Sequence, residues 1–345
     1  QGKQLLGFEY VGPFAELPVQ KDVKPKVIAW KEVSNSEGTG IVHIAPGAGA
    51  EDFALSKDLE NISVIAPLDE FGDFIGGFGW LTGRNVYEVN EDIYASLKQK
   101  NAFYRLEKYR HRYPVCWRCD SELVYRLVNE WFISMDQLRE MIAEVAREIK
   151  WVPEFGLQRE LDWLQNMDDW MISKKRYWGL ALPIYKCECG HFEVMGSEEE
   201  LKSKATSGWD SFDGHSPHRP WIDAVKIGCQ KCGSEISRIA DVGNPWLDAG
   251  IVSFSTIGYR HDRENWKKWF PADWITESFP GQFRNWFYSL LTMSTVLEEV
   301  TPTRVIHSYA LMRDEKGEEM HKSKGNAIWF EDAADKMGAD AMRWL

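Results

Sequence analysis

Residues 273–312 read DWITESFPGQFRNWFYSLLTMSTVLEEVTPTRVIHSYALM and alternate between strand-like and helix-like patterns. The run DWITES is typical of a strand, the stretch from about Phe283 to Glu299 has the spacing of an amphipathic helix, and VIHSYALM is again strand-like. An alternation of strand and helix favours a parallel sheet covered by helices. The predicted fold class around this stretch is therefore α/β with a parallel sheet.

The chain before this stretch has a different pattern of predicted elements. Residues 1–108 alternate short β-like runs with Gly-rich turns and helix-like segments, which predicts a mixed α/β or β-rich module and a boundary near residue 108. The β-like runs are residues 26–33, 40–46 and 62–67, and the helix-like segments are residues 50–59 and 87–101. Further helices are predicted in residues 134–150 and 161–173 and at the end of the chain.

Composition limits the function classes. The chain has 345 residues, of which 44% are apolar, with 17 Trp and 17 Phe, enough for a sizeable core in two or three domains. Its net charge of -12 argues against a protein that coats nucleic acid through bulk charge, but a local basic surface remains compatible with it. No apolar run reaches about 18 residues and no secretion signal opens the chain, which favours a cytosolic protein without membrane insertion. Nothing in the sequence implies an oligomer.

The ends of the sequence suggest a piece of a longer chain. The first residue is Gln1, and the last stretch, EDAADKMGADAMRWL, stops inside a helix-like pattern without a C-cap signal.

Six cysteines fall in three close pairs, which in a cytosolic protein favours metal binding or redox chemistry over structural disulfides. Two pairs, Cys187-x-Cys189 and Cys229-x-x-Cys232, are each followed by Gly and together provide four thiolates, a set that suits tetrahedral zinc. His191 could replace one thiolate, and the alternative is four buried free cysteines.

The third pair, Cys116-x-x-Cys119, supplies only half of a tetrahedral site. Its cysteines either stay as thiols or share a metal with a pair outside this chain.

The stretch EEMHKSKGNAI, residues 318–328, holds Lys322 and Lys324 around Ser323, followed by Gly325-Asn326. A flexible turn of this kind lets ammonium groups reach a polyphosphate whose charge grows in a transition state. The alternative is a solvated turn before the last helix.

Several separated motifs, in the order in which they occur, carry a resemblance to a known family. They are GTGIVHIAPGAGAEDF, YPVCWRCD, DWMISKKRYWG, PWLDAG, GQFRNWFYSLL and EMHKSKGN. This series resembles the class I aminoacyl-tRNA synthetases, and most closely their isoleucyl branch. The resemblance implies the second half of a Rossmann-type catalytic domain with a zinc-bearing insertion, preceded by part of a β-rich α/β editing domain. The implied parts are the end of the editing domain in residues 1–108, the return to the catalytic domain in 109–186, the zinc-binding insertion in 187–240, the Rossmann core in 241–315, and the lysine loop with the start of a helical region in 316–345.

The lysine loop takes its implied role from this family. Lys322 matches the second lysine of the KMSKS motif, which stabilises ATP phosphates as the aminoacyl-adenylate forms, and Ser323 follows it. The family's first lysine is Glu319 here, and its first serine is His321. ATP with Mg2+ is therefore the implied substrate of this loop.

The amino-acid and adenylate contacts are also implied by the resemblance. Trp246 and Trp286 match tryptophans that line the amino-acid pocket, and aromatic walls suit a branched apolar side chain. Gln282 matches a glutamine near substrate and adenylate, and Tyr309 falls where many relatives have an ATP-side His. Two core tryptophans are the alternative for Trp246 and Trp286. The family's HIGH motif does not occur in the sequence, which predicts that this chain alone does not activate an amino acid.

The segment GTGIVHIAPGAGAEDF resembles part of the family's editing site. There His43 and Asp52 match pocket positions, with Asp52 implied to bind the ammonium of a misattached amino acid. One methylene in an apolar pocket gives only about 1 to 3 kcal/mol of discrimination, and isoleucyl synthetases are the standard example of this limit. The alternative is a hydrogen-bonded His43 in a strand and an Asp52 favoured by the dipole of a helix N-terminus.

The first functional hypothesis is thus a fragment of an isoleucine–tRNA ligase that uses ATP, isoleucine and tRNA(Ile) and edits valyl-tRNA. Valyl and leucyl enzymes are the nearest rivals. A non-catalytic zinc-bearing RNA-binding module is a second hypothesis, and a free-standing editing hydrolase is a third.

Overall fold

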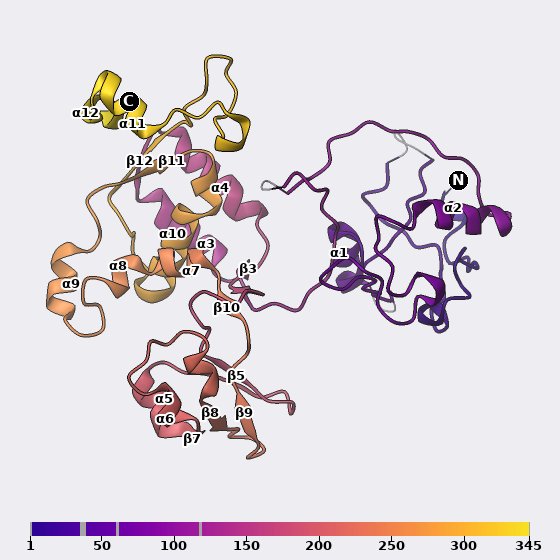
Figure 1. The fold of residues 1–345 in the computed structure, drawn as a ribbon, viewed down its shortest axis with the longest axis horizontal. Coiled ribbons are helices and arrows are strands. Elements are labelled where there is room, and N and C mark those ends of the chain that lie inside the picture. The colour runs from indigo at the N-terminus through magenta and orange to yellow at the C-terminus, as the bar shows by residue number, and fades with distance from the viewer. Residues whose placement is uncertain (1, 35–38, 60–61, 117–118, 345) are drawn as a thin grey trace. The chain divides into compact units, whose positions relative to one another are not determined.

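The computed structural model describes residues 2–34, 39–59, 62–116 and 119–344. The chain divides into two compact units, residues 1–129 and 130–345, so the units separate further along the chain than residue 108 (Figure 1).

Unit 1 is held together by a small apolar core rather than by a sheet. Leu17, Phe78, Leu81 and Val89 are its buried members. Its regular elements are η1 (Gly2–Gln4), η2 (Pro18–Gln20), α1 (Ala50–Asp58), η3 (Gly79–Leu81) and α2 (Asn90–Gln99).

The prediction of a β-rich module is wrong for the described part of unit 1. Residues 26–33, 40–46 and 62–67 form no strand, and the unit's pairing is limited to isolated bridges such as Glu9 with Lys26. A β-like run becomes a strand only when a neighbouring segment forms a ladder of backbone hydrogen bonds with it. The described residues of unit 1 contain no such partner segment. The two helix predictions, by contrast, are confirmed by α1 and α2.

The centre of unit 2 is a three-stranded parallel sheet. β11 (Ile275–Ser278) pairs with β12 (Val305–Tyr309), and β12 pairs with β2 (Lys150–Val152). α10 (Trp286–Glu298) connects β11 to β12, so residues 273–312 form the predicted β–α–β unit. The parallel α/β prediction is confirmed here.

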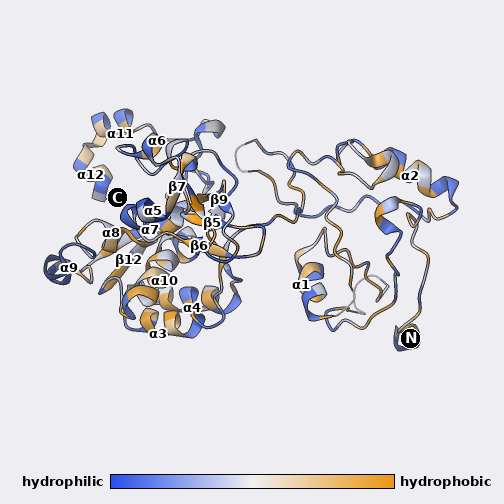
Figure 2. Cartoon of the chain, turned by 90° about the horizontal axis from the view of Figure 1, so that it is seen from below, coloured by the Kyte–Doolittle hydropathy of each residue, from blue (hydrophilic) through white to orange (hydrophobic). Residues whose placement is uncertain are grey.

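Three helices bury the main core of unit 2: α3 (Arg139–Arg147), α4 (Phe155–Asn166) and α10. α10 is largely hydrophobic in Figure 2 and has eight buried residues, as expected of a helix covered by its neighbours. α4 buries Gly156, Glu160 and Leu164, spaced four residues apart, so one carboxyl lies inside an apolar stripe. At Gly156 a Cβ would come within 2.9 Å of the Trp151 ring, so glycine permits the close approach of α4 to β2.

The structure confirms only the first half of the helix predicted over residues 161–173. α4 ends at Asn166, and the chain then continues through β3 (Trp170–Met171) and β4 (Ser173–Lys174). β3 pairs with β1 (Phe132–Ile133), and β4 pairs with β10 (Val242–Gly243), so tertiary pairing overrides the helical pattern after Met167.

A separate small core, centred on Tyr185, Phe212, Val225 and Ile227, organises the insertion. The elements around it are β5 (Ile184–Lys186), β6 (Phe192–Val194), α5 (Glu198–Lys204), β7 (Ala205–Ser207), α6 (Trp209–Phe212), η4 (Trp221–Ala224), β8 (Lys226–Gly228) and β9 (Glu235–Ser237). We call residues 181–241 the insertion module.

The remaining elements of unit 2 connect the insertion module to the sheet and follow β12. They are α7 (Pro245–Gly250), α8 (Val252–Ser255), α9 (Arg263–Trp269), η5 (Gly281–Arg284), η6 (Lys322–Lys324), α11 (Phe330–Met337) and α12 (Ala339–Trp344). Within the described ranges, every helix is too short or too polar to cross a membrane.

Candidate functional site

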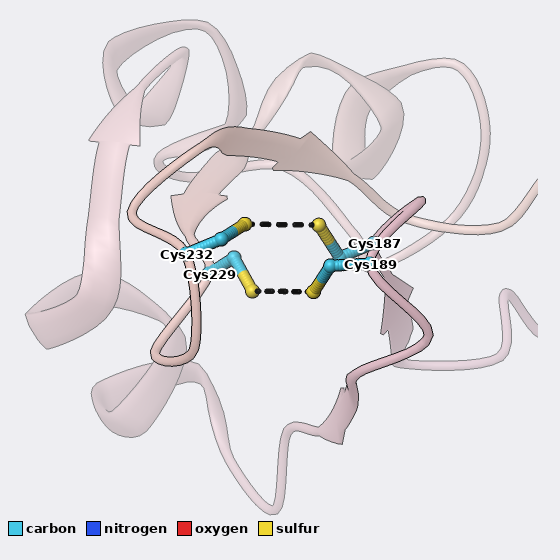
Figure 3. A group of neighbouring side chains, drawn as sticks. All are labelled: Cys187, Cys189, Cys229 and Cys232. Carbon is cyan, nitrogen blue, oxygen red and sulfur yellow. Dashed lines mark hydrogen bonds between the residues drawn. The ribbon is translucent and has the colours of Figure 1, made fainter.

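Four cysteines of the insertion module converge. The Sγ atoms of Cys187, Cys189, Cys229 and Cys232 all lie within 4.8 Å of one another, with 3.4 Å between Cys187 and Cys232 and 3.8 Å between Cys189 and Cys229 (Figure 3). A tetrahedral zinc with Zn–S bonds of about 2.3 Å would separate its sulfurs by about 3.8 Å. The thiols therefore fit a tetrahedral metal site.

Backbone turns present these thiols. In the second knuckle the Cys229 amide donates to the Ser234 carbonyl at 2.8 Å, and the Gly233 amide donates to the Cys229 carbonyl at 2.8 Å. Gly233 has a φ of +74°, which glycine adopts without strain. Side-chain and backbone hydrogen bonds with Ser234 lower the pKa of the Cys232 thiol to about 6, whereas the pKa of the neighbouring Cys187 thiol is raised to about 12. Of this pair, Cys232 is therefore the thiol that more readily becomes the thiolate that a metal binds.

The third cysteine pair, in unit 1, is flanked by the same two backbone hydrogen bonds. The Cys116 amide donates to the Ser121 carbonyl at 2.8 Å, the Asp120 amide donates to the Cys116 carbonyl at 2.8 Å, and Asp120 has a φ of +57°. Cys119 Sγ lies 3.3 Å from Ser121 Oγ, whose hydrogen bond lowers the pKa of the Cys119 thiol. This geometry repeats that of the Cys229 knuckle, although Trp117 and Arg118 lie outside the described residues.

The two tryptophans expected at an amino-acid pocket come from α7 and from the start of α10. The Trp286 indole N–H donates to the Ala249 carbonyl at 3.2 Å, which ties α10 to α7, and both Trp286 and Trp246 are partly buried against the main core. The Gln282 side-chain carbonyl accepts from the Trp286 amide at 3.1 Å. The structure thus brings together the elements that carry Trp246, Gln282 and Trp286.

Asn244 positions this group and was missed by the sequence reasoning. Its side chain caps α7 by accepting from the Trp246 amide at 3.1 Å, and it donates to the Met171 carbonyl at 3.0 Å. The signal was present as Asn before Pro245, because Asn at the N-cap with Pro at the first helical position is a typical helix start.

Tyr309 lies at the end of β12. Its hydroxyl donates to the Glu277 carboxylate at 3.5 Å, and the residue is 51% exposed. Burial and the nearby Glu277 charge raise the pKa of the Tyr309 hydroxyl.

The lysine loop is a closed hairpin. A bridge joins Arg313 to Glu319, and Lys322 and Ser323 lie in η6, which ends at Gly325 with a φ of +71°. The Lys322 ammonium lies 5.2 Å from the centre of the Trp329 ring, a cation–π contact. The Lys322 ammonium therefore lies against the exposed Trp329 ring.

Asp52, in the segment GTGIVHIAPGAGAEDF, lies in the first turn of α1. Asp52 Oδ2 accepts a hydrogen bond from the Ala45 amide at 2.7 Å, and Gly47 lies so close to the Ile65 carbonyl that a side chain could not fit. His43 is exposed, in a segment without strand structure, so the strand alternative for His43 is not met. Asp52 meets the helix-terminus alternative, and within the described ranges its Oδ1 has no hydrogen-bond partner.

Comparison with known proteins agrees with these motifs. Residues 14–345 match the family model of the tRNA synthetases class I (I, L, M and V). The chain is 36% identical over 347 residues to the isoleucine–tRNA ligase of Methanothermobacter thermautotrophicus and 37% identical over 351 residues to that of Sulfolobus acidocaldarius. Each alignment covers 100% of this chain and 33% of the relative, so the chain spans about a third of the length of the curated relatives it matches.

Among solved structures, a methionyl-tRNA synthetase of Mycobacterium tuberculosis in complex with methionyl-adenylate matches 67% of this chain and 36% of its own, with 17% identity and a TM-score of 0.41. The family is shown by the family model and the relatives alone. The chain belongs to the class I tRNA synthetases.

Proposed function

We propose that this chain is a segment of an isoleucine–tRNA ligase, which activates isoleucine with ATP and transfers it to tRNA. The observation that carries the proposal is the identity of 36–37% with isoleucine–tRNA ligases along the entire chain. The contact between α7 and α10 supports it, because it joins the two elements that carry Trp246 and Trp286, and aromatic walls suit an apolar amino acid.

In the activation step, a carboxylate oxygen of isoleucine forms a bond to the α-phosphorus of ATP, and the bond from that phosphorus to the pyrophosphate oxygen breaks. Negative charge grows on the leaving pyrophosphate. We assign Lys322 to neutralise this charge, with Ser323 beside it, and Mg2+ to accompany ATP. The Lys322 ammonium lies on an exposed ring at the surface, where leaving Trp329 for a phosphate costs only a weak contact.

For recognition, we assign Trp246 and Trp286 to the walls of the amino-acid pocket and Gln282 to the adenylate side. Tyr309 is assigned to the ATP side at the end of β12, because ligands in parallel α/β sheets bind beyond the carboxyl ends of the strands. In the transfer step, a terminal ribose hydroxyl of tRNA attacks the acyl carbon, and AMP leaves with the pair of electrons of the broken bond.

For editing, we assign Asp52 to the ammonium of misattached valine and His43 to the same pocket. Asp52 supports this role because one carboxylate oxygen accepts from the Ala45 amide, while the other has no hydrogen-bond partner among the described residues. In the complete enzyme we expect Asp52→Asn to accumulate valyl-tRNA, since the amide keeps an acceptor for Ala45 and loses the charge. Glu51→Gln, which changes the neighbouring acid of the same turn, is the matched control; equal accumulation in both variants would refute the role of Asp52.

For the metals, we assign a structural zinc to Cys187, Cys189, Cys229 and Cys232, where it would cross-link the two knuckles of the insertion module. Cys116 and Cys119 are assigned to a second zinc shared with two thiols outside this chain, on the ground that their turn repeats the Cys229 knuckle.

The test is charging by the complete enzyme with each of three amino acids. Stable attachment of isoleucine to tRNA, with valine attached only when Asp52 is changed, is the expected outcome. Stable attachment of valine or leucine by the unchanged enzyme would overturn the assignment.

A further inference from the structure

Two segments that lie about 40 residues apart in sequence form a set of stacked rings in unit 2. The Trp178 ring stacks on His218 with centroids 5.3 Å apart and planes at 15°, and the Arg219 guanidinium lies 4.7 Å over the Tyr177 ring. His215 and Trp221 stack in the same loop at 3.8 Å and 6°. We call these six side chains the ring platform: Tyr177, Trp178, His215, His218, Arg219 and Trp221.

The rings of the platform remain open to solvent although they are stacked. Trp178 is 69% exposed, Tyr177 60% and Trp221 43%. A tryptophan in a folded protein normally buries most of its surface, and these rings belong to none of the three apolar clusters of unit 2. Their exposed faces are thus available to a ligand.

Hydrogen bonds and ion pairs hold the loop of the platform that carries Arg219. Arg219 donates to Asp223 at 2.7 Å and to the Ala240 carbonyl at 3.3 Å. Arg238, whose side chain is almost fully buried, binds Asp223 and donates to the Asp241 carbonyl at 2.8 Å. Because these contacts fix the loop that carries His218 and Arg219, the side chains of this loop lose little further conformational entropy when a ligand binds.

The charges around the platform favour an anionic ligand. Two nearby carboxylates are already paired, Asp223 with Arg219 and Asp241 with Lys175 at 2.9 Å. Arg176 is exposed, immediately precedes the platform in sequence, and has no ion pair within the described ranges. A polyanion that reaches the platform therefore meets the exposed Arg176 beside two carboxylates that are already paired.

The platform also lies near the proposed aminoacylation site. Gly179, the neighbour of Trp178, packs against β10, where a Cβ on Gly179 would lie 3.0 Å from the Val242 side chain. α7, which carries Trp246, begins at Pro245, shortly after Val242. A nucleic acid that passes over the platform would thus arrive beside the elements assigned to the amino acid.

We propose that the ring platform binds unpaired nucleotides of RNA by stacking, as the single-stranded end of the tRNA approaches the aminoacylation site. Every base has a flat face, so exposed rings combined with cations bind single strands with little sequence preference. This inference rests on the proposed function, because it identifies where the tRNA partner of that reaction is held.

The experiment measures RNA binding by the 345-residue chain in the absence of ATP and amino acid. A fluorescein-labelled single-stranded octanucleotide and a blunt RNA hairpin are compared by fluorescence anisotropy at low salt. The single strand should bind more tightly than the hairpin. Trp178→Ala and Trp178→Leu should both weaken its binding by about 5- to 150-fold, since stacking on one ring contributes about 1–3 kcal/mol per base. Trp178→Phe should retain most of the affinity, because it keeps an aromatic face.

Trp269→Ala is the matched control, since Trp269 is 67% exposed on α9, outside the platform. Unchanged metal content in the Trp178 variants verifies that the insertion module is folded. Equal binding of hairpin and single strand, or unchanged affinity in Trp178→Leu, would overturn the proposal. If the unmodified complete enzyme showed no isoleucine-dependent reaction, the proposed function would be refuted. The RNA-binding result would still decide the role of the ring platform.

Discussion

Asn326 and Asp314 join the two sides of the lysine loop: the Asn326 amide donates to Asp314 Oδ2 at 2.8 Å. The Asn326 side-chain carbonyl also accepts from the His321 amide at 2.9 Å, next to Lys322. Asp314 Oδ1 accepts from the amides of Lys316 and Glu318. These two side chains together hold the hairpin that carries Lys322.

We predict that Asn326→Ala opens this hairpin, because the loop loses the bonds that the side chain makes to both sides. Limited trypsin digestion should cleave the variant within residues 313–324 several-fold faster than the unchanged chain. Glu315→Ala, at an exposed position of the same loop, should leave the cleavage rate unchanged. Equal rates for Asn326→Ala and the unchanged chain would show that the Asp314–Asn326 contact does not hold the loop.

Lys322→Ala in the complete enzyme should slow adenylate formation by about 10²–10³-fold, the usual effect of removing a group that stabilises transition-state charge. The dissociation constant of ATP should change by less than about threefold, because the contact strengthens only as pyrophosphate departs. Single-turnover kinetics and equilibrium ATP binding measure the two quantities. Lys316→Ala is the control, and equal losses in rate and binding for Lys322→Ala would contradict the assignment.

Cys229→Ser should abolish metal binding by the 345-residue chain, because it removes one of four converging thiols. We expect about one zinc per chain before the change, measured by elemental analysis, and a lower melting temperature after removal of zinc by a chelator. Cys119→Ser should leave both quantities unchanged in this chain, since the Cys116 turn holds only two thiols. Equal loss of zinc in both variants would refute the four-cysteine site.

Glu160→Leu should stabilise unit 2. Both Glu160 oxygens are buried without a hydrogen-bond partner within the described ranges, and burial raises the pKa of this carboxyl well above its ordinary value of 4.5. Replacing an unsatisfied buried polar group removes a desolvation cost of about 1–3 kcal/mol, which raises the melting temperature by about 2–4 °C per kcal/mol in a unit of this size.

The pH dependence of the Glu160 effect has a definite sign. Since the folded carboxyl has the higher pKa, its contribution is complete below the unfolded pKa and is lost as pH rises through the folded pKa. The gain from Glu160→Leu should therefore be larger at pH 7 than at pH 4. Glu154→Gln, at an exposed position just before α4, is the control. A constant gain at both pH values would show that the pKa of Glu160 is the same in the folded and unfolded chain.

The sequence predicted those features that depend on local pattern. The parallel strands β11 and β12 with α10 between them follow from periodicity, and the four converging cysteines follow from spacing and from the glycines that form the knuckles. These signals are local because each strand, helix or turn is encoded in consecutive residues.

The remaining features depend on contacts between distant segments. The β-like runs of unit 1 form no ladder in the described residues, and residues 170–174 become strands because β1 and β10 pair with them. The Lys322–Trp329 contact, the Asp314–Asn326 bond and the ring platform likewise join side chains whose proximity no periodicity encodes.

The central claim is that the complete enzyme activates isoleucine, and amino-acid-dependent exchange of pyrophosphate into ATP tests it most directly, because this reaction does not require tRNA. We predict that isoleucine drives the exchange with the highest kcat/KM and that valine and leucine are weaker. One missing methylene allows only about 10- to 200-fold discrimination, a limit for which isoleucyl synthetases are the standard example. Exchange driven preferentially by valine or leucine, or no exchange with isoleucine, would contradict the account.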